Sequence, residues 1–418
     1  MKWVACDNTD ENRGKTAVLK FGGRLLTDNG HIRRVAEVIR RYLDKGYRLS
    51  VIISSMGDTT DRLIEMANDV SDDFDGREMD QLLATGGQQS VALLALALKR
   101  EGISAQSFTA AQAGFRANGF PMEGRIYRVD PSSVTAAMDA GMVAVVAGFQ
   151  AITGDGDVIT LGRGGTDLSA VALAAALGGE CHIFKEAGGI LSADPDVVRS
   201  ASRLDYLEYS ECMELSILGA KVLKARSVEV AARYEAPIYV ASGFTEEGGT
   251  WIVKNNPVSE GLVVKGVVLD SGVAKVVMMG VPDVPGVAGR LFSNLAERSI
   301  GPEMIIQNNM RGGLNDIGFL VKKESLDDTI EVCRDFARNI DAQGVSFNTE
   351  ISRVSIVGAG IANHPEVPSR MFNVLAGEGI NIDMIAATAL AVTCVVASPR
   401  AEDAVRALHA HFIEEGEI

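Results

Sequence analysis

The sequence of 418 residues lacks several features that would place it in a narrow class of proteins. It has no run of 18 apolar residues, which excludes a membrane-spanning helix. Its five cysteines are scattered and none belongs to a Cys-x-x-Cys pair, so neither a disulfide framework nor a zinc site is expected. It has no basic stripe with interleaved aromatic residues, and its net charge of −15 argues against nucleic-acid binding.

The N-terminal segment, residues 1–15, is polar and lacks the apolar centre of a signal peptide. Together with the unpaired cysteines, this predicts a protein of the reducing cytoplasm. Apolar residues make up 47% of the chain and charged residues 23%, which is ordinary for a globular protein. The length is sufficient for two or three domains with a substantial core.

Strand and helix patterns alternate over some 240 residues of the first part of the chain, which begins at residue 17 and changes in character after Trp251. Apolar runs at Ala17–Leu19, Leu49–Ile53 and Met142–Ala147 predict buried strands. Apolar residues at helical spacing predict helices between them, the first of which is capped by Asp28 or Asn29. This alternation predicts an α/β domain around a mainly parallel sheet.

The C-terminal part follows a polar break at residues 254–257 and contains an internal repeat. Identical residue types recur at an offset of 80, from the pair Gly280 and Gly360 to the pair Ile305 and Ile385. Each copy reads as a strand, a proline-containing loop, a helix and a strand, and a second helix follows in each. The repeat therefore predicts two related βαββαβ modules that pack side by side.

Two glycine clusters are the strongest indication of function. One is Lys20-Phe21-Gly22-Gly23, and the other is the segment Leu161–Asp167, about 140 residues later. Each opens a helix and carries a cation, and the first follows an apolar strand. Backbone N–H groups at a helix N-terminus bind anions, and glycine lets a phosphate approach closely. Cations add positive charge where negative charge develops during phosphoryl transfer, so the pair predicts a cradle for a polyphosphate.

The order of these motifs resembles the aspartokinase family, in which an amino-acid-kinase domain precedes two ACT regulatory domains. The resemblance extends from about residue 17 to residue 415. Besides the two glycine clusters, it is carried by Ser54–Asp61, Gln112–Gly114, Val146–Gln150, Gly219–Leu223, Pro285-Gly286, Met304–Asn308, Val357–Gly360 and Gly379–Ile382.

The resemblance implies an α/β fold: an amino-acid-kinase-like parallel-sheet sandwich followed by two ferredoxin-like ACT domains. The expected boundaries are a polar extension at residues 1–16, a catalytic domain at 17–257, a first ACT domain at 262–342 and a second at 345–418. It also implies a homodimer or larger assembly through the ACT domains, whose strand edges tend to pair.

The reaction that the resemblance implies is transfer of the γ-phosphoryl group of ATP, with Mg²⁺, to the β-carboxylate of aspartate. Lys20 is similar to the family lysine that stabilises the transferring phosphoryl group, and Asp167 would orient Lys20 or organise the Mg²⁺. No separate protein metal site is expected. The backbone or side chains expected to bind the nucleotide are those of Gly22, Gly23, Gly164, Gly165, Thr166, Lys185 and Lys221.

Other positions match those that bind the acceptor or a regulator in the family. Arg163 would pair with a substrate carboxylate, and Thr59 lines the substrate site. Arg24 and Gly87 also fall at acceptor-contact positions. An amino-acid effector is expected at the ACT domains, with Asp283, Gln307 and Asn381 as its contacts.

Several of these positions depart from the family pattern. Gly87 replaces a glutamate that helps to recognise the ammonium of aspartate, Arg24 and Leu25 replace Thr-Ser, and Asp196 replaces an arginine on the phosphate side. Lys185 is a candidate to compensate for that arginine. Two alternatives therefore stay open: a kinase of the same chemistry for a carboxylate that lacks the ammonium contact, and a weakly active regulatory or partner subunit.

Overall fold

The computed structural model describes residues 15–71, 75–186, 188–244, 248–255, 263–309 and 313–416. The predicted N-terminal extension lies almost wholly outside these ranges. The described chain forms two compact units. The first takes in residues 15–191, 203–216 and 222–255, and the second takes in residues 192–202, 217–221 and 263–416. The chain thus enters the second unit twice and returns each time to the first, before it passes into the second unit for the last time.

A sheet with eight strands among the described residues forms the centre of the first unit. Neighbouring strands are parallel except β13 and β14, which confirms the predicted mainly parallel sheet. In order across the sheet, the strands are β12 (Tyr206–Glu208), β14 (Thr250–Val253), β13 (Ile238–Ser242), β9 (Glu180–Lys185), β1 (Thr16–Phe21), β2 (Arg48–Ile53), β6 (Val143–Ala147) and β3 (Ala105–Phe108).

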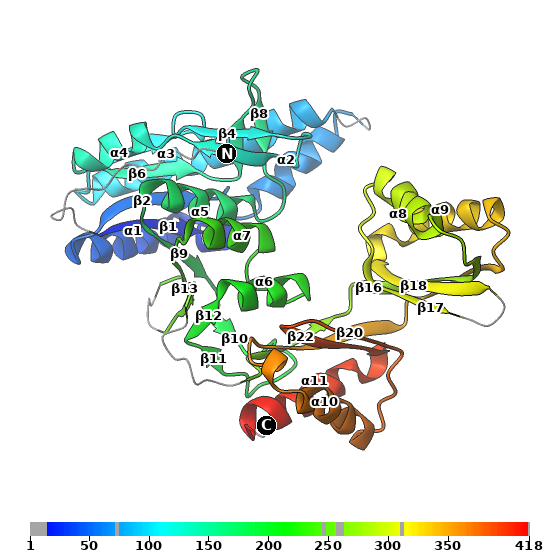
Figure 1. Ribbon diagram of the computed structural model, residues 1–418. Coiled ribbons are helices and arrows are strands. Elements are labelled where there is room, and N and C mark those ends of the chain that lie inside the picture. Colours follow the sequence, from blue (N-terminus) through cyan, green and yellow to red (C-terminus); the bar gives the residue numbers. More distant parts are fainter. Residues whose placement is uncertain are drawn as a thin grey trace. The chain divides into compact units, whose positions relative to one another are not determined.

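Helices cover both faces of this sheet (Figure 1). On one face α1 (Asn29–Asp44) and α3 (Gly76–Arg100) pack on alternate residues of the strands, such as Leu19, Val51 and Val145. On the other face lie α4 (Ser132–Asp139) and α5 (Gly165–Leu177), and α7 (Ala225–Tyr234) packs against α5. The strands are buried on both faces, which is why they read as continuous apolar runs.

Local sequence signals explain where the first helix starts. Asp28 precedes α1, and its Oδ1 accepts hydrogen bonds from the amides of Gly30 and His31 at 2.7 and 2.9 Å. Of the two caps proposed from the sequence, Asp28 is therefore the one that the structure uses.

The first unit also contains short elements that the sequence patterns did not predict. A small sheet has the order β5 (Arg125–Val129), β4 (Phe115–Asn118), β7 (Gln150–Ile152) and β8 (Val158–Thr160). Helix α2 (Thr59–Asn68) packs on α3. The strands β10 (Ile190–Leu191) and β11 (Arg203–Leu204) pair antiparallel, and α6 spans Tyr209–Ile217. These strands have two to five residues, and none of them is a continuous apolar run like that of β6.

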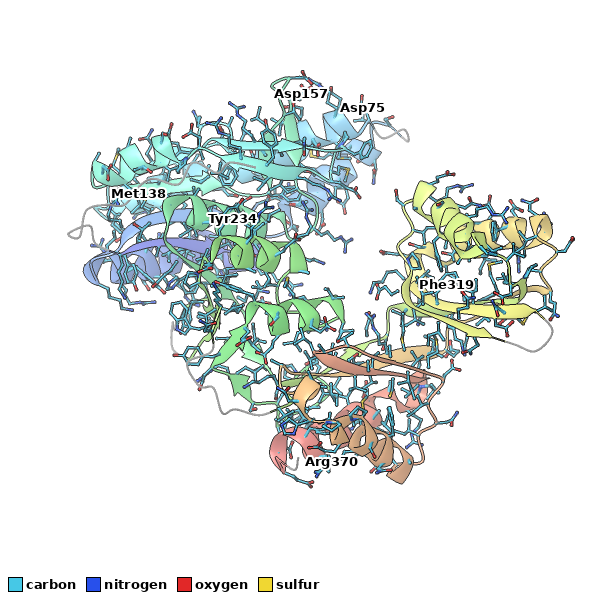
Figure 2. The ribbon with its side chains drawn as sticks, in the orientation of Figure 1. Asp75, Met138, Asp157, Tyr234, Phe319 and Arg370 are labelled. Carbon is cyan, nitrogen blue, oxygen red and sulfur yellow. The ribbon has the colours of Figure 1, made fainter. Side chains whose placement is uncertain are left out.

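The second unit contains two four-stranded antiparallel sheets, each covered by two helices. In the first of these sheets with its helices, Phe319 is buried between the sheet and the helices (Figure 2). The centroid of its ring lies 5.7 Å from that of Phe292. The first module consists of β17 (Glu303–Asn309), β18 (Leu314–Lys322), β16 (Val273–Pro282) and β19 (Gly344–Asn348), with α8 (Val287–Glu297) and α9 (Leu326–Asn339). The second consists of β15 (Gly266–Asp270), β20 (Ile351–Val357), β22 (Ala391–Ala397) and β21 (Met384–Ala387), with α10 (Glu366–Gly377) and α11 (Ala401–His409).

No single position in the sequence separates the strands of the first sheet from those of the second. Strand β15, which precedes the first module in the chain, pairs with β20 of the second. Strand β19, at the expected boundary near residues 342–345, pairs with β16 of the first. An end strand can pair with any sheet edge within reach, and a residue pattern does not say which edge that is.

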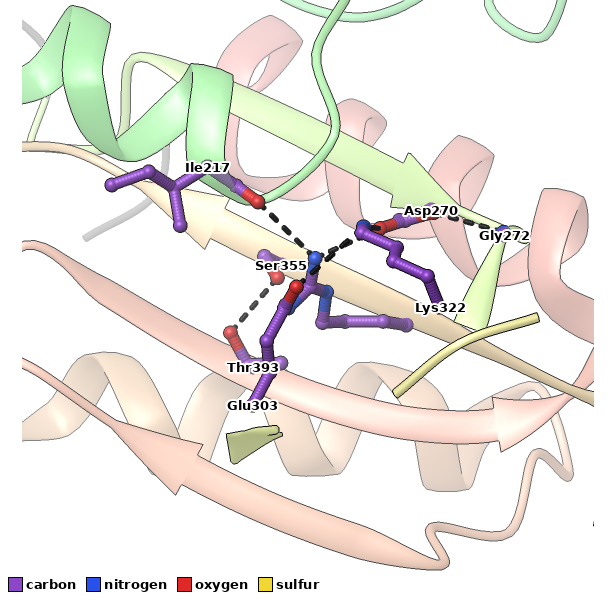
Figure 3. Close-up of polar contacts among 8 residues, drawn as sticks. Ile217, Asp270, Gly272, Glu303, Lys322, Ser355 and Thr393 are labelled. Carbon is purple, nitrogen blue, oxygen red and sulfur yellow. Dashed lines mark hydrogen bonds and ion pairs between the residues drawn. The ribbon is translucent and has the colours of Figure 1, made fainter. Parts of the chain in front are cut away.

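A buried arginine joins segments of the second unit. Arg353 on β20 is 3% exposed and donates to Asp270 Oδ2 at 2.8 Å and to the carbonyl oxygen of Ile217 at 3.2 Å. It also forms an ion pair with Glu303. Figure 3 shows Asp270, Glu303 and Lys322 in this cluster, in which Lys322 lies 3.0 Å from Asp270. The cluster therefore ties β20 to β15, to β17 and to the last residue of α6.

Residues 192–202 also belong to the second unit, although they connect β10 and β11 of the first. Ala193 and Val198 pack in the core under the second sheet. Ser192 Oγ lies 2.8 Å from Nε2 of the fully buried His409 on α11. The segment thus contributes apolar surface and a buried hydrogen bond to the second module.

Candidate functional site

The central feature of the candidate site is an ion pair between Lys20 on β1 and Asp167 on α5. Leu19 and Phe21 face α1 and α3, so the alternation of a strand directs Lys20 to the opposite face, where α5 packs. Lys20 is 8% exposed, and its Nζ lies 2.7 Å from Asp167 Oδ1. The two remote glycine clusters therefore meet in space, as the sequence predicted.

The first glycine turn packs closely against the turn that follows β2. A Cβ on Gly23 would lie 2.5 Å from the carbonyl oxygen of Ser55, and the amide of Gly57 donates to the Gly23 carbonyl at 3.1 Å. A Cβ on Gly22 would lie 3.4 Å from Lys20 Nζ. The absence of side chains at both positions leaves the space beside the lysine ammonium open to a ligand.

The second glycine turn opens α5. Gly162 and Gly164 have φ values of 70° and 79°, a left-handed conformation that favours glycine. No side chain caps α5 at Gly164, and the amide of Gly165 donates to the carbonyl of Gly162 at 2.9 Å. The amides of Thr166 and Asp167 are those that this turn can offer to an anion. Gly165 packs against Leu161, and the hydroxyl of Thr166 accepts a hydrogen bond from Ser54 Oγ at 2.9 Å. These contacts hold the start of α5 beside the end of β2.

Three lysines surround the one carboxylate of this cluster. Burial alone would raise the pKa of Asp167, but the positive charges of Lys20, Lys185 and Lys224 outweigh it and hold that pKa below its ordinary value. Burial lowers the pKa of the Lys185 amine, and the charges of Lys20 and Lys224 lower it further, while Asp167 opposes them. An excess of ammonium groups over carboxylates is an arrangement suited to a polyphosphate.

The predicted acceptor residues lie around the same strand ends in the first unit. Arg163 is exposed within the second glycine turn, and Thr59 is the first residue of α2. Gly87 is buried on α3, and a Cβ there would lie 3.2 Å from Gln150 Nε2. That amide donates to the carbonyl of Ala84 at 3.0 Å, so the group nearest to Gly87 is neutral.

Arg24 is directed toward solvent. It pairs with Glu186 at 3.2 Å, and its side chain is 83% exposed. An exposed pair of this kind contributes little to stability. The structure therefore associates Arg24 with Glu186 rather than with the Lys20 cluster.

Lys221 forms an exposed ion pair within the second unit. Its Nζ lies 3.1 Å from Asp194 Oδ2, its side chain is 84% exposed, and both residues belong to the second unit. Lys224, three residues later, belongs to the first unit and lies beside Gly164. Sequence reasoning passed over Lys224, although it stands in the same motif as Lys221.

The three predicted effector contacts are exposed residues of the second unit. Asp283 accepts a hydrogen bond from Asn315 Nδ2 at 2.9 Å, and Gln307 lies on β17. Asn381 lines a cavity of about 410 Å³ together with Lys275 and other residues. Neither Asp283 nor Gln307 lines that cavity.

Asp80 on α3 is a second residue that the sequence did not single out. It is 1% exposed and accepts hydrogen bonds from Thr160 Oγ1 at 2.6 Å and from the amide of Met122 at 3.1 Å. Thr160 immediately precedes the second glycine turn, and Met122 O lies 2.9 Å from where a Cβ of Gly162 would stand. Asp80 thus positions the strand end that carries this turn.

We expect Asp80→Ala to destabilise the protein by about 1–3 kcal/mol, because the buried hydroxyl of Thr160 and the part-buried amide of Met122 lose their acceptor. Asp80→Asn should cost far less, since its amide oxygen still accepts a bond. Burial raises the pKa of Asp80 against the effect of its hydrogen bonds. The stability linked to its proton is therefore fully present below the ordinary pKa of about 3.8 and is lost as the pH rises through the higher pKa of the folded state. Urea unfolding of the three proteins at pH 7 tests this, and equal losses in both variants would contradict it.

Comparison with known proteins agrees with this architecture. The model of the amino acid kinase family matches residues 15–242, and that of an ACT domain matches residues 354–412. Among solved structures, E. coli aspartokinase III in complex with aspartate and ADP has the same fold, with a TM-score of 0.78 at 21% identity, over 95% of this chain and 99% of that one. Aspartate kinase from Synechocystis matches with a TM-score of 0.53 at 37% identity, over 95% of this chain and 69% of that one. Fold and site therefore define an amino acid kinase with an ACT regulatory part.

Sequence relatives narrow this class. The chain is 40% identical to an aspartokinase of Thermus thermophilus over 94% of its own length and 98% of that protein. It is 38% identical to an aspartokinase of Pseudomonas aeruginosa over 94% of its own length and 97% of that protein. The chain belongs to the aspartokinase family, and it is a phosphotransferase with a carboxyl group as acceptor. Within the described residues, no helix has the length and apolarity that crossing a membrane requires.

Proposed function

We propose that this protein transfers the γ-phosphoryl group of ATP to the β-carboxylate of aspartate, and that its ACT domains regulate the reaction. The observation that carries the proposal is the Lys20–Asp167 ion pair between two glycine turns, at the carboxyl ends of parallel strands. An oxygen of the acceptor carboxylate attacks the γ-phosphorus, and the bond to the β–γ bridging oxygen breaks. ADP leaves with the electron pair, and the product is an acyl phosphate.

Such a reaction needs positioning and charge neutralisation more than a base, because the acceptor carboxylate is already ionised at pH 7. Asp167 holds the Lys20 ammonium beside the glycine turns, and Lys185 adds a second cation at the end of β9. The amides at the start of α5 and the turn at Gly22 complete a set of donors for the phosphates. Arg163 is the residue we propose for the acceptor carboxylate.

Mg²⁺ neutralises phosphate charge when it is bound with the nucleotide. The cluster offers one carboxylate, Asp167, which is already bonded to Lys20. Among the described residues, no group of three or more His, Cys, Asp or Glu could hold a metal ion. We therefore propose that the nucleotide phosphates carry the ion and that Asp167 orients Lys20, which is one of the two roles expected for it.

One observation supports a second candidate, a kinase of the same chemistry for a carboxylate without an ammonium group. The neutral amide of Gln150 is the nearest group to Gly87, where the family has a glutamate. An amino group placed there would lack a negative partner, at a cost of about 1–3 kcal/mol.

An acyl-phosphate assay separates these candidates. The protein is incubated with Mg-ATP and one carboxylic acid at a time, the product is trapped with hydroxylamine, and ADP is measured. Hydroxamate that depends on aspartate supports the first candidate, and hydroxamate only with an acid that lacks the amine supports the second. No turnover with any acid, together with binding to a conventional aspartokinase, would indicate the partner subunit instead.

The ACT part suggests an amino-acid effector. E. coli aspartokinase III, at 21% identity, has been solved in complex with lysine and aspartate. We propose that this protein also binds an amino acid, with Asp283, Gln307 and Asn381 as contacts. We also propose a cytoplasmic location, to which the buried free thiols of Cys181, Cys212, Cys333 and Cys394 are suited.

We expect the protein to be a homodimer or larger assembly in solution. Ile305 on β17 and Ile385 on β21 are 50% and 45% exposed, lie at equivalent positions of the repeat, and stand on strands at the edges of their sheets. Such edges tend to pair with another chain. Multi-angle light scattering should give at least twice the mass of the chain, and Ile305→Lys should reduce it. A monomer at micromolar concentration would contradict the prediction.

A further inference from the structure

Lys224 lies against the second glycine turn and has no role in the proposal above. It immediately precedes α7, with extended backbone, and its carbonyl accepts a hydrogen bond from the amide of Ser227 at 2.8 Å. A Cβ on Gly164 would lie 2.2 Å from Lys224 Cγ. The aliphatic stem of the lysine therefore crosses directly over the glycine that opens α5, and it does so only because that residue has no side chain.

The ammonium of Lys224 acts on the same groups as Lys20 and Lys185. Its charge lowers the pKa of Asp167 and also that of the Lys185 amine. Lys20 is buried and bonded to Asp167, whereas Lys224 is exposed. No hydrogen bond or ion pair to the Lys224 ammonium occurs within the part of the chain that the structure describes. It is thus a free cation beside an open helix N-terminus.

We propose that Lys224 binds a phosphate of the bound nucleotide, as the third lysine of the site. This rests on the proposed function, and it adds Lys224 to the nucleotide contacts that the sequence predicts. Lys224 has the positive charge and the position over Gly164 that a phosphate contact requires, and its ammonium has no ion-pair partner among the described residues.

The opposing interpretation is that Lys224 only packs on Gly164 through its stem. Lys224→Met separates the two, because methionine keeps an unbranched apolar stem and loses the charge. Lys224→Arg keeps the charge. Lys254→Met is a matched control, since Lys254 is an exposed lysine of the same unit whose partner is Glu235.

The test uses titration calorimetry on the full chain, with Mg-ADP and with adenosine as a probe that lacks phosphates. We expect Lys224→Met to bind Mg-ADP about tenfold more weakly than the unchanged protein, because one charge-assisted contact is lost. Its affinity for adenosine should not change. Lys224→Arg should recover most of the ADP affinity, and Lys254→Met should match the unchanged protein with both probes.

Other outcomes overturn the proposal in distinguishable ways. If the unchanged protein binds ADP and Lys224→Met binds it equally well, Lys224 does not contact phosphate and the proposed function is unaffected. If ADP and adenosine lose affinity equally, Lys224 supports the structure of the site only. If the unchanged protein binds neither probe, the nucleotide site itself is refuted, and the proposed function fails with it.

Discussion

Replacing Lys20 by methionine should lower kcat by about a thousandfold or more, a size typical of losing one preorganised charge in a phosphoryl-transfer site. Lys20 is the cation that the fold holds most tightly: it lies on a central strand, is nearly buried, and is fixed by Asp167. Neither Lys185 nor Lys224 can take its place, because each lies on a different element. The hydroxamate assay at saturating Mg-ATP measures the loss.

The fold should survive this change. Without Lys20 the Asp167 carboxylate still lies in the field of Lys185 and Lys224, so it is not an isolated buried charge. Lys20→Met/Asp167→Asn should melt closer to the unchanged protein than Lys20→Met does, since it removes both charges. Lys99→Met, at an exposed position near the end of α3, is the matched control and should keep full activity. Activity retained in a folded Lys20→Met protein would remove Lys20 from the mechanism.

Replacing Arg353 by methionine should destabilise the second unit by about 3–5 kcal/mol, the cost of leaving the buried carboxylate of Asp270 and the part-buried one of Glu303 without their partner. Asp270 and Glu303 would then share Lys322 alone, and the last carbonyl of α6 would lose its donor. Both tryptophans of the sequence, Trp3 and Trp251, lie outside residues 263–416, so circular dichroism is a better probe of this unit than tryptophan fluorescence. Urea unfolding followed by circular dichroism measures the shift.

Two further variants identify the cause. Arg406 also pairs with two carboxylates, Glu402 and Asp403, but at the surface, so Arg406→Met should cost less than about 1 kcal/mol. Adding Asp270→Asn and Glu303→Gln to Arg353→Met should restore part of the lost stability, because the uncompensated charges are then gone. If Arg353→Met costs no more than Arg406→Met, the buried cluster does not stabilise the unit.

Much of the fold could be predicted because its signals are local. The runs at Ala17–Leu19 and Leu49–Ile53 are strands, Asp28 caps α1, and the repeat at an offset of 80 corresponds to two similar sheets with their helices. Each of these depends on neighbours along the chain, or on a periodic pattern that any buried face imposes. The short strands β4, β5, β7 and β8 lack an apolar run of that kind, and they were missed.

The candidate site was predicted as a set of residues more successfully than as a set of contacts. Lys20, the glycine turns and Asp167 come together as expected. Arg24 and Lys221 have partners elsewhere, in Glu186 and Asp194, because a long charged side chain pairs with whatever group lies nearest in space. Lys224 carried no signal of its own, since its place over Gly164 depends on how α7 packs against α5.

The amino-acid sequence by itself determined the parts of this protein that follow from backbone freedom and from burial along one element: the two glycine turns, the cation beside each, and the paired modules of the C-terminal half. Only the tertiary structure decided which lysines face Asp167, and which sheet receives β15 and β19. The reason is physical. Glycine conformation and apolar periodicity are properties of short segments, whereas an ion pair or a strand edge is satisfied by the first suitable partner within a few ångströms, however distant it is along the chain.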